Sequence, residues 1–508
     1  MLGLGLHQAL AHPGRAGTPE REAAVVVMVV HVVHETHLVP DEEARSAVAR
    51  PLPRFREAIS RSCARGRAAT ARREAFGETN STSNEEIALT AHPTRFVIIG
   101  NGAAGTYAAE QLRKLDAAAE IVMIDDEPYT LYNRVSLPRY LRGVLLEQRV
   151  YVRDMEWHTK NRIDLRLETK VDQVNFDEKT VHMEPGGEIS YDRLLIATGG
   201  RPNPLRAPGA EGAPYLFNFQ YFDEAKGMVA RIPESKVAVV LGGSFIGYEL
   251  TEAFAHRGLE THWLMRGPWF LRRALDEEGG KVITLLAQDA GVHLHYDEAI
   301  DRLERSNGQL KVIGTKGFTA TADLVGVGLG LTMNIDIFEG TGLETNVGVK
   351  TNELLETNMP DVWAAGDVAE FYDVVSQRHH RMGTWDNSLN HGRHVAKNML
   401  GAKEPYIEVP TYASGMFNSN ISVMGVTTEE EPDAEAVVEV EYEPRNYKRL
   451  FFLGDKLVGA ILVGKMRGRK KVLELISSRT PIEDRRKVFE LLAMPELPTK
   501  AAATPTEE

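Results

Sequence analysis

Three glycines within six residues form the clearest candidate binding motif in this sequence. The run Phe96-Val-Ile-Ile-Gly100-Asn-Gly102-Ala103-Ala104-Gly105 predicts a buried strand, a tight turn and the start of a helix. Gly100 permits the turn, Gly102 lets backbone amides approach a pyrophosphate, and Gly105 lets the helix pack closely on the strand. The motif therefore predicts a dinucleotide site, which includes Ala103 and Ala104.

Acidic residues follow at the distance that this kind of site requires. Asp125, Asp126 and Glu127 stand at the end of the next predicted strand, about 20 residues beyond the glycines. A carboxylate at that place accepts hydrogen bonds from ribose hydroxyls. We expect Asp126 and Glu127 to bind there, and the alternative is a solvated strand end.

A second motif of the same type departs from the pattern at one position. Val240-Leu-Gly242-Gly243-Ser244-Phe245-Ile246-Gly247 lies between a predicted strand, Val237 to Leu241, and a predicted helix, Ile246 to Arg257. Ser244 takes the place of the middle glycine, so its side chain either loosens phosphate binding or supplies a hydroxyl donor. Two motifs of this type predict two bound nucleotides.

The strand after the second motif bears on which nucleotide binds there. It ends at Met265-Arg266, so the acid that would hold the 2′-hydroxyl of NADH is missing. A guanidinium beside that position favours the 2′-phosphate of NADPH, and the alternative is a surface arginine. The predicted nucleotide set also includes Gly328.

Each of the two glycine motifs is followed along the chain by a shorter motif. They are Ala197-Thr198-Gly199, which follows Leu194-Leu-Ile, and Gly366-Asp367, which follows Asp361-Val-Trp-Ala-Ala. Together with the paired glycine motifs they resemble FAD-dependent pyridine nucleotide oxidoreductases with two dinucleotide folds, over roughly residues 94 to 493. The resemblance implies that the Ala-Thr-Gly turn marks the crossing between the FAD and nucleotide domains. It also implies that Asp367 holds the ribityl or pyrophosphate region of FAD.

The segment from Glu127 to Tyr140 narrows the resemblance to rubredoxin and ferredoxin reductases and the flavin module of NAD(P)H nitrite reductases. In that group the matching residues imply that Arg134 contacts FAD and that Arg139 replaces a lysine near the flavin. Val171 matches a position that contacts the adenine. Trp385 matches a helix start that faces the flavin ring, with plain core packing as its alternative.

The candidate catalytic residues are Glu249 and Arg139. Glu249 follows Gly247-Tyr248 at the start of the second motif's helix. The resemblance implies that it can pair with Arg139 close to flavin N5, where a cation favours negative charge on the reduced flavin. The alternative is a helix-start glutamate that interacts only with the helix dipole.

Composition argues against several other classes of protein and site. Cys63 is the only cysteine, so the chain can form neither an internal redox disulfide nor a cysteine-ligated cluster. The histidines at 379, 380, 391 and 394 lack a zinc-ligand pattern, and we expect no metal. A net charge of -13 argues against nucleic-acid binding, and the longest apolar run, Ala23 to Val30, is too short to span a bilayer.

Alternating strand and helix patterns predict an α/β fold with two Rossmann-like dinucleotide-binding domains and a C-terminal α+β domain. The NAD(P) domain is inserted in the FAD domain, which explains the distance between Gly100 and Asp367. The expected parts are a disordered or mis-assigned extension at 1–92, FAD-binding segments at 93–212 and 333–405, an NAD(P) domain at 213–332, a C-terminal domain at 406–495 and a disordered tail at 496–508.

The sequence thus predicts a cytoplasmic flavoprotein reductase that uses FAD and NAD(P)H, with a lean to NADPH. Hydride passes to FAD N5, and electrons then leave for a small ferredoxin- or rubredoxin-type protein. Three alternative functions stay open: an oxidase or quinone reductase, a flavin subunit of a larger reductase such as nitrite reductase, and a non-enzymatic signalling flavoprotein. Whether the chain forms a homodimer also stays open.

Overall fold

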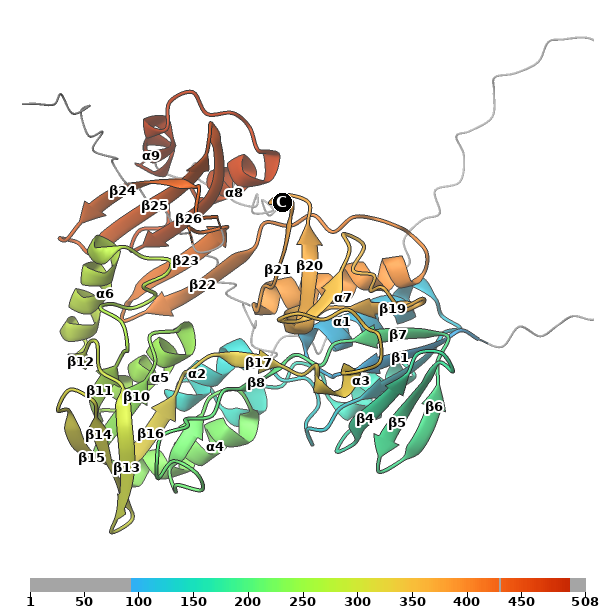
Figure 1. Cartoon of the computed structure of the whole chain (residues 1–508), viewed down its shortest axis with the longest axis horizontal. Coiled ribbons are helices and arrows are strands. Elements are labelled where there is room, and N and C mark those ends of the chain that lie inside the picture. The colour runs from blue at the N-terminus through green and yellow to red at the C-terminus, as the bar shows by residue number, and fades with distance from the viewer. Residues whose placement is uncertain (1–92, 429–430, 494–508) are drawn as a thin grey trace, which may run out of the picture. The chain divides into compact units, whose positions relative to one another are not determined.

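The computed structural model describes residues 93–428 and 431–493 (Figure 1). The predicted extension at 1–92, which contains Cys63, and the predicted tail at 496–508 lie outside these residues.

A parallel sheet of five strands carries the first glycine motif. Its order is β19-β7-β1-β2-β3, so a strand from late in the chain completes a sheet that begins at residue 95. The strands are β1 (Arg95–Ile99), β2 (Glu120–Ile124), β3 (Ile163–Arg166), β7 (Arg193–Ile196) and β19 (Val362–Ala364). The helices of this part are α1 (Ala103–Leu115), α3 (Met155–Lys160) and α7 (Trp385–Met399), whereas α2 (Leu137–Leu141) packs into the core of the second sheet. Apolar side chains fill both faces of the sheet, as expected of parallel strands.

Helices α1 and α7 cross at a glycine. A Cβ atom on Gly392 of α7 would lie 2.2 Å from the carbonyl oxygen of Ala104 and 3.0 Å from the amide nitrogen of Ala108, both in α1. Because backbone atoms cannot give way locally, only glycine allows this approach. The crossing holds the start of α7 beside the first motif.

Smaller sheets flank this part of the chain. They are β4 (Lys170–Asn175), β5 (Thr180–Glu184) and β6 (Gly187–Ser190); β18 (Val349–Thr351), β20 (Ala369–Asp373) and β21 (Arg378–His380); and the antiparallel pair β8 (Gly200–Pro202) and β17 (Leu331–Met333). The β8–β17 pair links the chain as it leaves the first sheet to the chain as it returns.

A second parallel sheet, of order β12-β11-β10-β16-β9, carries the second glycine motif. Its strands are β9 (Leu216–Asn218), β10 (Val237–Leu241), β11 (Glu260–Leu264), β12 (His293–His295) and β16 (Leu324–Val327). Its helices are α4 (Phe222–Arg231), α5 (Phe245–His256) and α6 (Glu277–Asp289), and an antiparallel meander adds β13 (Ile300–Ser306), β14 (Gln309–Gly314) and β15 (Thr319–Ala322).

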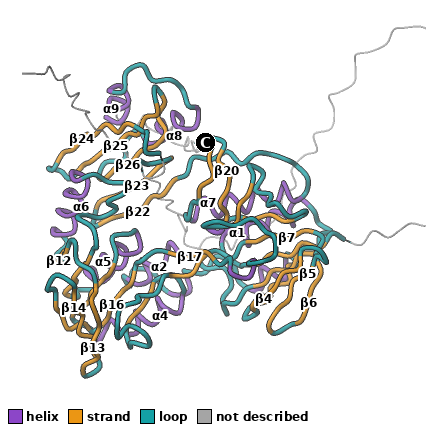
Figure 2. The backbone as a smooth tube through the Cα atoms, viewed as in Figure 1, coloured by secondary structure: helices purple, strands orange, loops and turns teal. Residues whose placement is uncertain are grey.

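The C-terminal part is an antiparallel sheet with two helices, and Figure 2 shows its long strands. The order β22-β23-β26-β25-β24 leaves β22 at one edge. The elements are β22 (Thr411–Met416), β23 (Ser419–Gly425), β24 (Glu435–Glu441), β25 (Asn446–Leu453), β26 (Lys456–Val463), α8 (Arg469–Ser478) and α9 (Arg486–Ala493). Trp263 and Phe270 of the second part and Tyr447 and Phe451 of this one belong to a single apolar core.

The chain is therefore an α/β protein with two Rossmann-like units and a C-terminal α+β unit, as predicted. The exact domain limits stay a prediction. None of the described helices combines the length and the hydropathy needed to cross a bilayer.

We expect Gly392→Ala to lower the free energy of unfolding by about 1–3 kcal/mol, because the added methyl group forces α7 away from α1. Chemical denaturation measures this change. Gly415→Ala is the matched control, since its Cβ would meet nothing closer than the Ser419 carbonyl oxygen at 3.9 Å. Equal stability of the two variants would contradict the role given to the crossing.

Candidate functional site

The glycines of the first motif serve two different purposes. A Cβ atom on Gly100 would lie 2.2 Å from the carbonyl oxygen of Ala197, and one on Gly105 would lie 2.0 Å from that of Gly100. Those two positions need glycine for the fold itself. A Cβ on Gly102 would meet no protein atom within 4 Å, at an extended backbone that any residue adopts. The space beside Gly102 is therefore open, as the approach of a pyrophosphate to the loop would require.

Ala103 and Ala104 begin α1 and are buried under this loop. Gly102, the N-cap, forms no side-chain cap, so the backbone amides of the first turn stay available to an anion.

Asp125 holds the loop in place. Its carboxylate accepts from the amide nitrogens of Asn101 at 2.5 Å and Glu127 at 2.9 Å, and burial raises its pKa to about 6. The sequence analysis placed it only in an acidic cluster and did not separate it from its neighbours. Asp126 is exposed beside it, free to face a ribose.

Glu127 and Arg134 form an ion pair. The Nη2 atom of Arg134 lies 2.6 Å from one carboxylate oxygen of Glu127, and the Tyr132 hydroxyl donates to the other at 2.7 Å. Burial would lower the pKa of Arg134, but Tyr132 and Glu127 raise it above its usual range. Glu127 thus orients Arg134, a role that the pattern alone did not indicate.

The late Gly366-Asp367 motif reaches the first motif, as the resemblance implied. It lies in a short 3-10 helix, Gly366–Val368, and the positive φ of 80° at Gly366 places its Cα so close to α1 that a Cβ would lie 2.9 Å from the Ala104 methyl group. Asp367 accepts from the Ser388 hydroxyl at 2.8 Å. Burial raises its pKa, while Ser388, Arg134 and Arg381 act in the opposite direction.

His391, which the sequence marked only as lacking a zinc-ligand pattern, is a positioning residue. It is fully buried, and its Nδ1 accepts from the Gly366 amide at 3.2 Å. Burial lowers its pKa to about 3, so the ring is neutral and fixes the turn that carries Asp367. Its only signal in the sequence is its place on α7, four residues before Val395 of the core.

The Ala197-Thr198-Gly199 turn is tied to the returning chain. Thr198 and Asn334 exchange two hydrogen bonds of 2.9 Å, from the Thr198 hydroxyl and from the Asn334 amide. The turn therefore lies where the chain leaving the first sheet meets the returning chain, and its place at a domain boundary stays a prediction. Val171 is buried in the core at β4, and Trp385, the first residue of α7, is half-buried with none of the described rings stacked on it.

The second loop repeats the first with its own contacts. A Cβ on Gly242 would lie 2.1 Å from the Gly328 carbonyl oxygen, and one on Gly247 would lie 2.0 Å from that of Gly242. Gly328 is equally constrained, since its Cβ would lie 2.6 Å from the Gly247 nitrogen. A Cβ on Gly243 would lie 3.3 Å from the Met265 side chain.

Ser244 uses its hydroxyl within the protein. It donates to the Gly328 carbonyl oxygen at 2.8 Å and accepts from the Gly247 amide at 3.3 Å. The hydroxyl proton is therefore already committed, which disfavours the predicted alternative of a donor to phosphate. Phe245 and Ile246 follow as the half-buried first residues of α5.

The predicted ion pair between Glu249 and Arg139 is not formed. Glu249 accepts from the Tyr412 hydroxyl at 3.2 Å, and Arg139 is exposed. The short helix α2 instead presents Arg142 to α5, where its Nη1 atom lies 2.9 Å from Glu252. The basic residue that acts electrostatically on Glu249 is thus Arg142, about one helical turn after the expected Arg139.

Arg266 lies at the end of β11, exposed as a phosphate ligand requires. Arg272 was not singled out from the sequence, yet its side chain packs on Gly267, where a Cβ would lie 2.3 Å from the Arg272 Cδ atom. Within the described residues neither arginine forms an ion pair, and both side chains belong to exposed residues.

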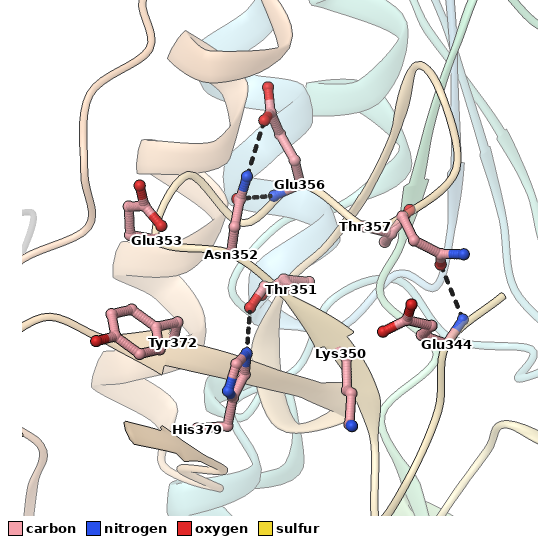
Figure 3. Close-up of a pocket in the computed structure, with 10 residues that line it drawn as sticks. Glu344, Lys350, Thr351, Asn352, Glu353, Glu356, Thr357, Tyr372 and His379 are labelled. Carbon is pink, nitrogen blue, oxygen red and sulfur yellow. Dashed lines mark hydrogen bonds between the residues drawn. The ribbon is translucent and has the colours of Figure 1, made fainter. Parts of the chain in front are cut away.

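A surface cavity of about 440 Å³ lies apart from these residues (Figure 3). Its polar groups largely bond to one another: His379 contacts the Thr351 carbonyl oxygen at 3.1 Å, and Asn352 donates to Glu356 at 3.0 Å. No residue predicted to bind a cofactor lines it. Within residues 93–428 and 431–493 no cluster of His, Cys, Asp or Glu could hold a metal ion.

Two family models match the chain. Residues 94–392 match the pyridine nucleotide-disulphide oxidoreductase family, and residues 416–480 match the rubredoxin NAD+ reductase C-terminal domain. The chain belongs to the pyridine nucleotide-disulphide oxidoreductase family and is an oxidoreductase. FAD and a nicotinamide nucleotide are the cofactors that this family implies. The open space at Gly102 and the buried carboxylate of Asp367 fit a bound dinucleotide.

Individual relatives agree with this assignment. The ferredoxin–NAD(+) reductase component of the anthranilate 1,2-dioxygenase system of Burkholderia cepacia is 31% identical over 65% of this chain and 82% of that protein. The nitrite reductase (NAD(P)H) of Bacillus subtilis (strain 168) is 24% identical over 78% of this chain, which spans 48% of that protein. An engineered water-forming NADPH oxidase bound to NADPH shares the fold, with a TM-score of 0.70, 21% identity, and coverage of 76% of this chain and 92% of that one.

We expect Gly102→Val to remove FAD without unfolding the protein, because the added side chain meets no other segment of the protein but enters the space where the pyrophosphate would approach. Gly105→Val is the comparison, and it should destabilise the apoprotein through its backbone clash. Flavin absorbance per chain and the thermal midpoint of the apoprotein measure the two effects. A full flavin content in Gly102→Val would show that the space serves another purpose.

Proposed function

We propose that this protein is an FAD-dependent NAD(P)H reductase that passes electrons to a small iron-sulfur or rubredoxin-type protein. The observation that carries the proposal is the pair of glycine loops, of which the first is joined by Asp367 and Arg134 from distant parts of the chain. The similar Burkholderia protein is by its name a ferredoxin–NAD(+) reductase, which supports the choice of acceptor.

Electrons leave this protein without a cysteine relay. Residues 93–508 contain no cysteine, although the family's name refers to disulphide reduction. Because the single cysteine, Cys63, cannot form a disulphide within the chain, we expect the reduced cofactor to donate directly.

The residues of the first site would bind and orient FAD. The α1 amides and the space at Gly102 receive the pyrophosphate, and Asp367, held by Ser388 and His391, accepts from hydroxyl groups of the cofactor. Arg134, held by Glu127, supplies a fixed positive charge. When bound, FAD accepts hydride from the reduced nicotinamide and can release electrons one at a time.

The residues of the second site bring the nicotinamide nucleotide to the flavin. The start of α5 would bind its phosphates, and Gly328 lets the loop approach closely enough to form that site. Glu249 lies one turn into that helix, where a carboxylate can orient the nicotinamide carboxamide. We keep Glu249 as a candidate catalytic residue. Arg139 stays a candidate for the flavin side, without the ion pair that was expected.

The acceptor is tested by reoxidation. The protein, reduced anaerobically with NADPH or NADH, is mixed with a ferredoxin, a rubredoxin, a quinone or oxygen. We expect fast reoxidation by a carrier protein and slow reoxidation by the small oxidants. Cys63→Ser should behave as the unaltered chain does, and faster turnover with oxygen would instead favour the oxidase alternative.

A flavin subunit of a larger reductase remains the second candidate, because about half of the Bacillus nitrite reductase aligns with this chain. Stable co-purification with a cluster-containing protein would support it. We keep the cytoplasm as the proposed compartment, and residues 1–92 do not enter the proposal.

For the nucleotide we favour NADPH, because Arg266 and Arg272 stand beside Met265 where an NADH site would have an acid. The substitutions named for the engineered NADPH oxidase remove an aspartate, place an arginine directly after it and add another arginine six positions further on. Met265, Arg266 and Arg272 have this order and spacing. The NAD(+) in the name of the Burkholderia relative points the other way.

Arg266→Ala and Arg272→Ala should each lower kcat/KM for NADPH roughly tenfold or more, since each removes a charge-assisted hydrogen bond to the 2′-phosphate. The kcat/KM for NADH is the internal control and should stay constant, because NADH lacks that group. A strong NADH preference that neither substitution alters would refute the assignment.

A further inference from the structure

The edge strand of the C-terminal sheet lies along the helix that begins at the second glycine loop. Four hydrogen bonds join β22 and the turn after it to α5: Tyr412 to Glu249 at 3.2 Å, Tyr248 to the Gly415 carbonyl oxygen at 2.6 Å and to the Ser414 hydroxyl, and the Phe417 amide to Glu252 at 2.7 Å. Successive polar residues on one face of α5 thus have partners in the C-terminal part. The position of this helix therefore depends on a different domain from the one that contains it.

Tyr412 also covers the start of the helix. Its ring lies against that of Phe245, with 3.8 Å between ring centroids and 34° between the planes. Phe245 directly follows the N-cap Ser244. One side chain of the C-terminal part therefore touches both the residue after the nucleotide loop and the candidate catalytic carboxylate.

The surroundings of Glu249 make its ionisation sensitive to this contact. Burial raises its pKa to about 7, the hydrogen bond from Tyr412 lowers it, the neighbouring carboxylate Glu252 raises it, and Arg142 at the end of α2 lowers it. These are the groups that face Glu249 from β22, α5 and α2. Loss of the Tyr412 hydroxyl removes the direct hydrogen bond to the carboxylate and leaves only the more distant charges.

We propose that Tyr412 is a positioning residue for the reductive half-reaction: its hydroxyl bonds to Glu249 and favours the ionised carboxylate at the nicotinamide side, so that the C-terminal domain completes the nucleotide site. This inference rests on the proposed function, since it assigns a task in the reduction of FAD by NAD(P)H. It assigns no new chemical step to Tyr412, which acts through Glu249.

The test is the pH dependence of the limiting rate of flavin reduction, measured by rapid mixing with saturating NADPH and again with NADH. In the unaltered protein the rate should rise with pH through a step near 7, where Glu249 ionises. Tyr412→Phe keeps the ring and removes the hydroxyl, which raises the pKa of Glu249. The step should move to higher pH, and the rate at neutral pH should fall roughly tenfold.

The difference between Tyr412→Phe and the unaltered protein should disappear at high pH, where Glu249 is ionised in both. A purely structural role would lower the rate at every pH. Glu249→Gln should abolish the pH-dependent step in the reduction rate. If Tyr412→Phe does not fold, Glu249→Gln still tests whether Glu249 is the group that ionises.

Tyr447→Phe is the matched control. Tyr447 is another tyrosine of the C-terminal sheet whose hydroxyl donates to a carboxylate of the second part, Asp276, away from Glu249. Tyr447→Phe should leave the pH of the step in the reduction rate unchanged. An unmoved step in Tyr412→Phe, or an equal movement in Tyr447→Phe, would overturn the inference. If neither nucleotide reduces the flavin of the unaltered protein, the proposed function itself fails.

Discussion

Close backbone approach at two glycine loops is the constraint on which the rest of this structure depends. In each loop the first glycine touches a carbonyl of a neighbouring segment, Ala197 in one case and Gly328 in the other, and the last glycine touches the carbonyl of the first. These contacts tolerate no Cβ atom, so they set where α1 and α5 begin. Since anions bind at helix starts, the same contacts decide where two nucleotides can lie.

Buried polar groups then bring distant segments to those two places. Asp367 comes from the chain after the second sheet, yet Ser388 and His391 hold it beside α1. Burying a carboxylate is costly unless hydrogen bonds and opposite charge compensate it. Ser388 bonds to Asp367 directly, and Arg134 and Arg381 supply the charge, so the site and the packing of the FAD part stabilise each other.

Local patterns predicted the elements well. The expected helix start after Gly102 and the expected strand over Val237 to Leu241 match α1 and β10, because glycines and apolar runs mark these boundaries. Contacts between distant residues were not predictable in this way. Tyr412 lies 163 residues from Glu249, and no spacing rule connects them, so the analogy supplied Arg139 as the partner instead. Asp125 and Asp126 are adjacent in sequence, and only burial distinguishes the loop-holding residue from the exposed one.

The two loops also differ in how many backbone donors they keep free. Ser244 caps its own helix by accepting from the Gly247 amide, whereas Gly102 leaves the first turn of α1 uncapped. The first loop can therefore offer more amides to a phosphate than the second. A reductase retains its flavin through many cycles but must release the oxidised nucleotide in each one. The serine thus leaves one backbone amide fewer for the ligand that has to leave than the glycine leaves for the ligand that has to stay.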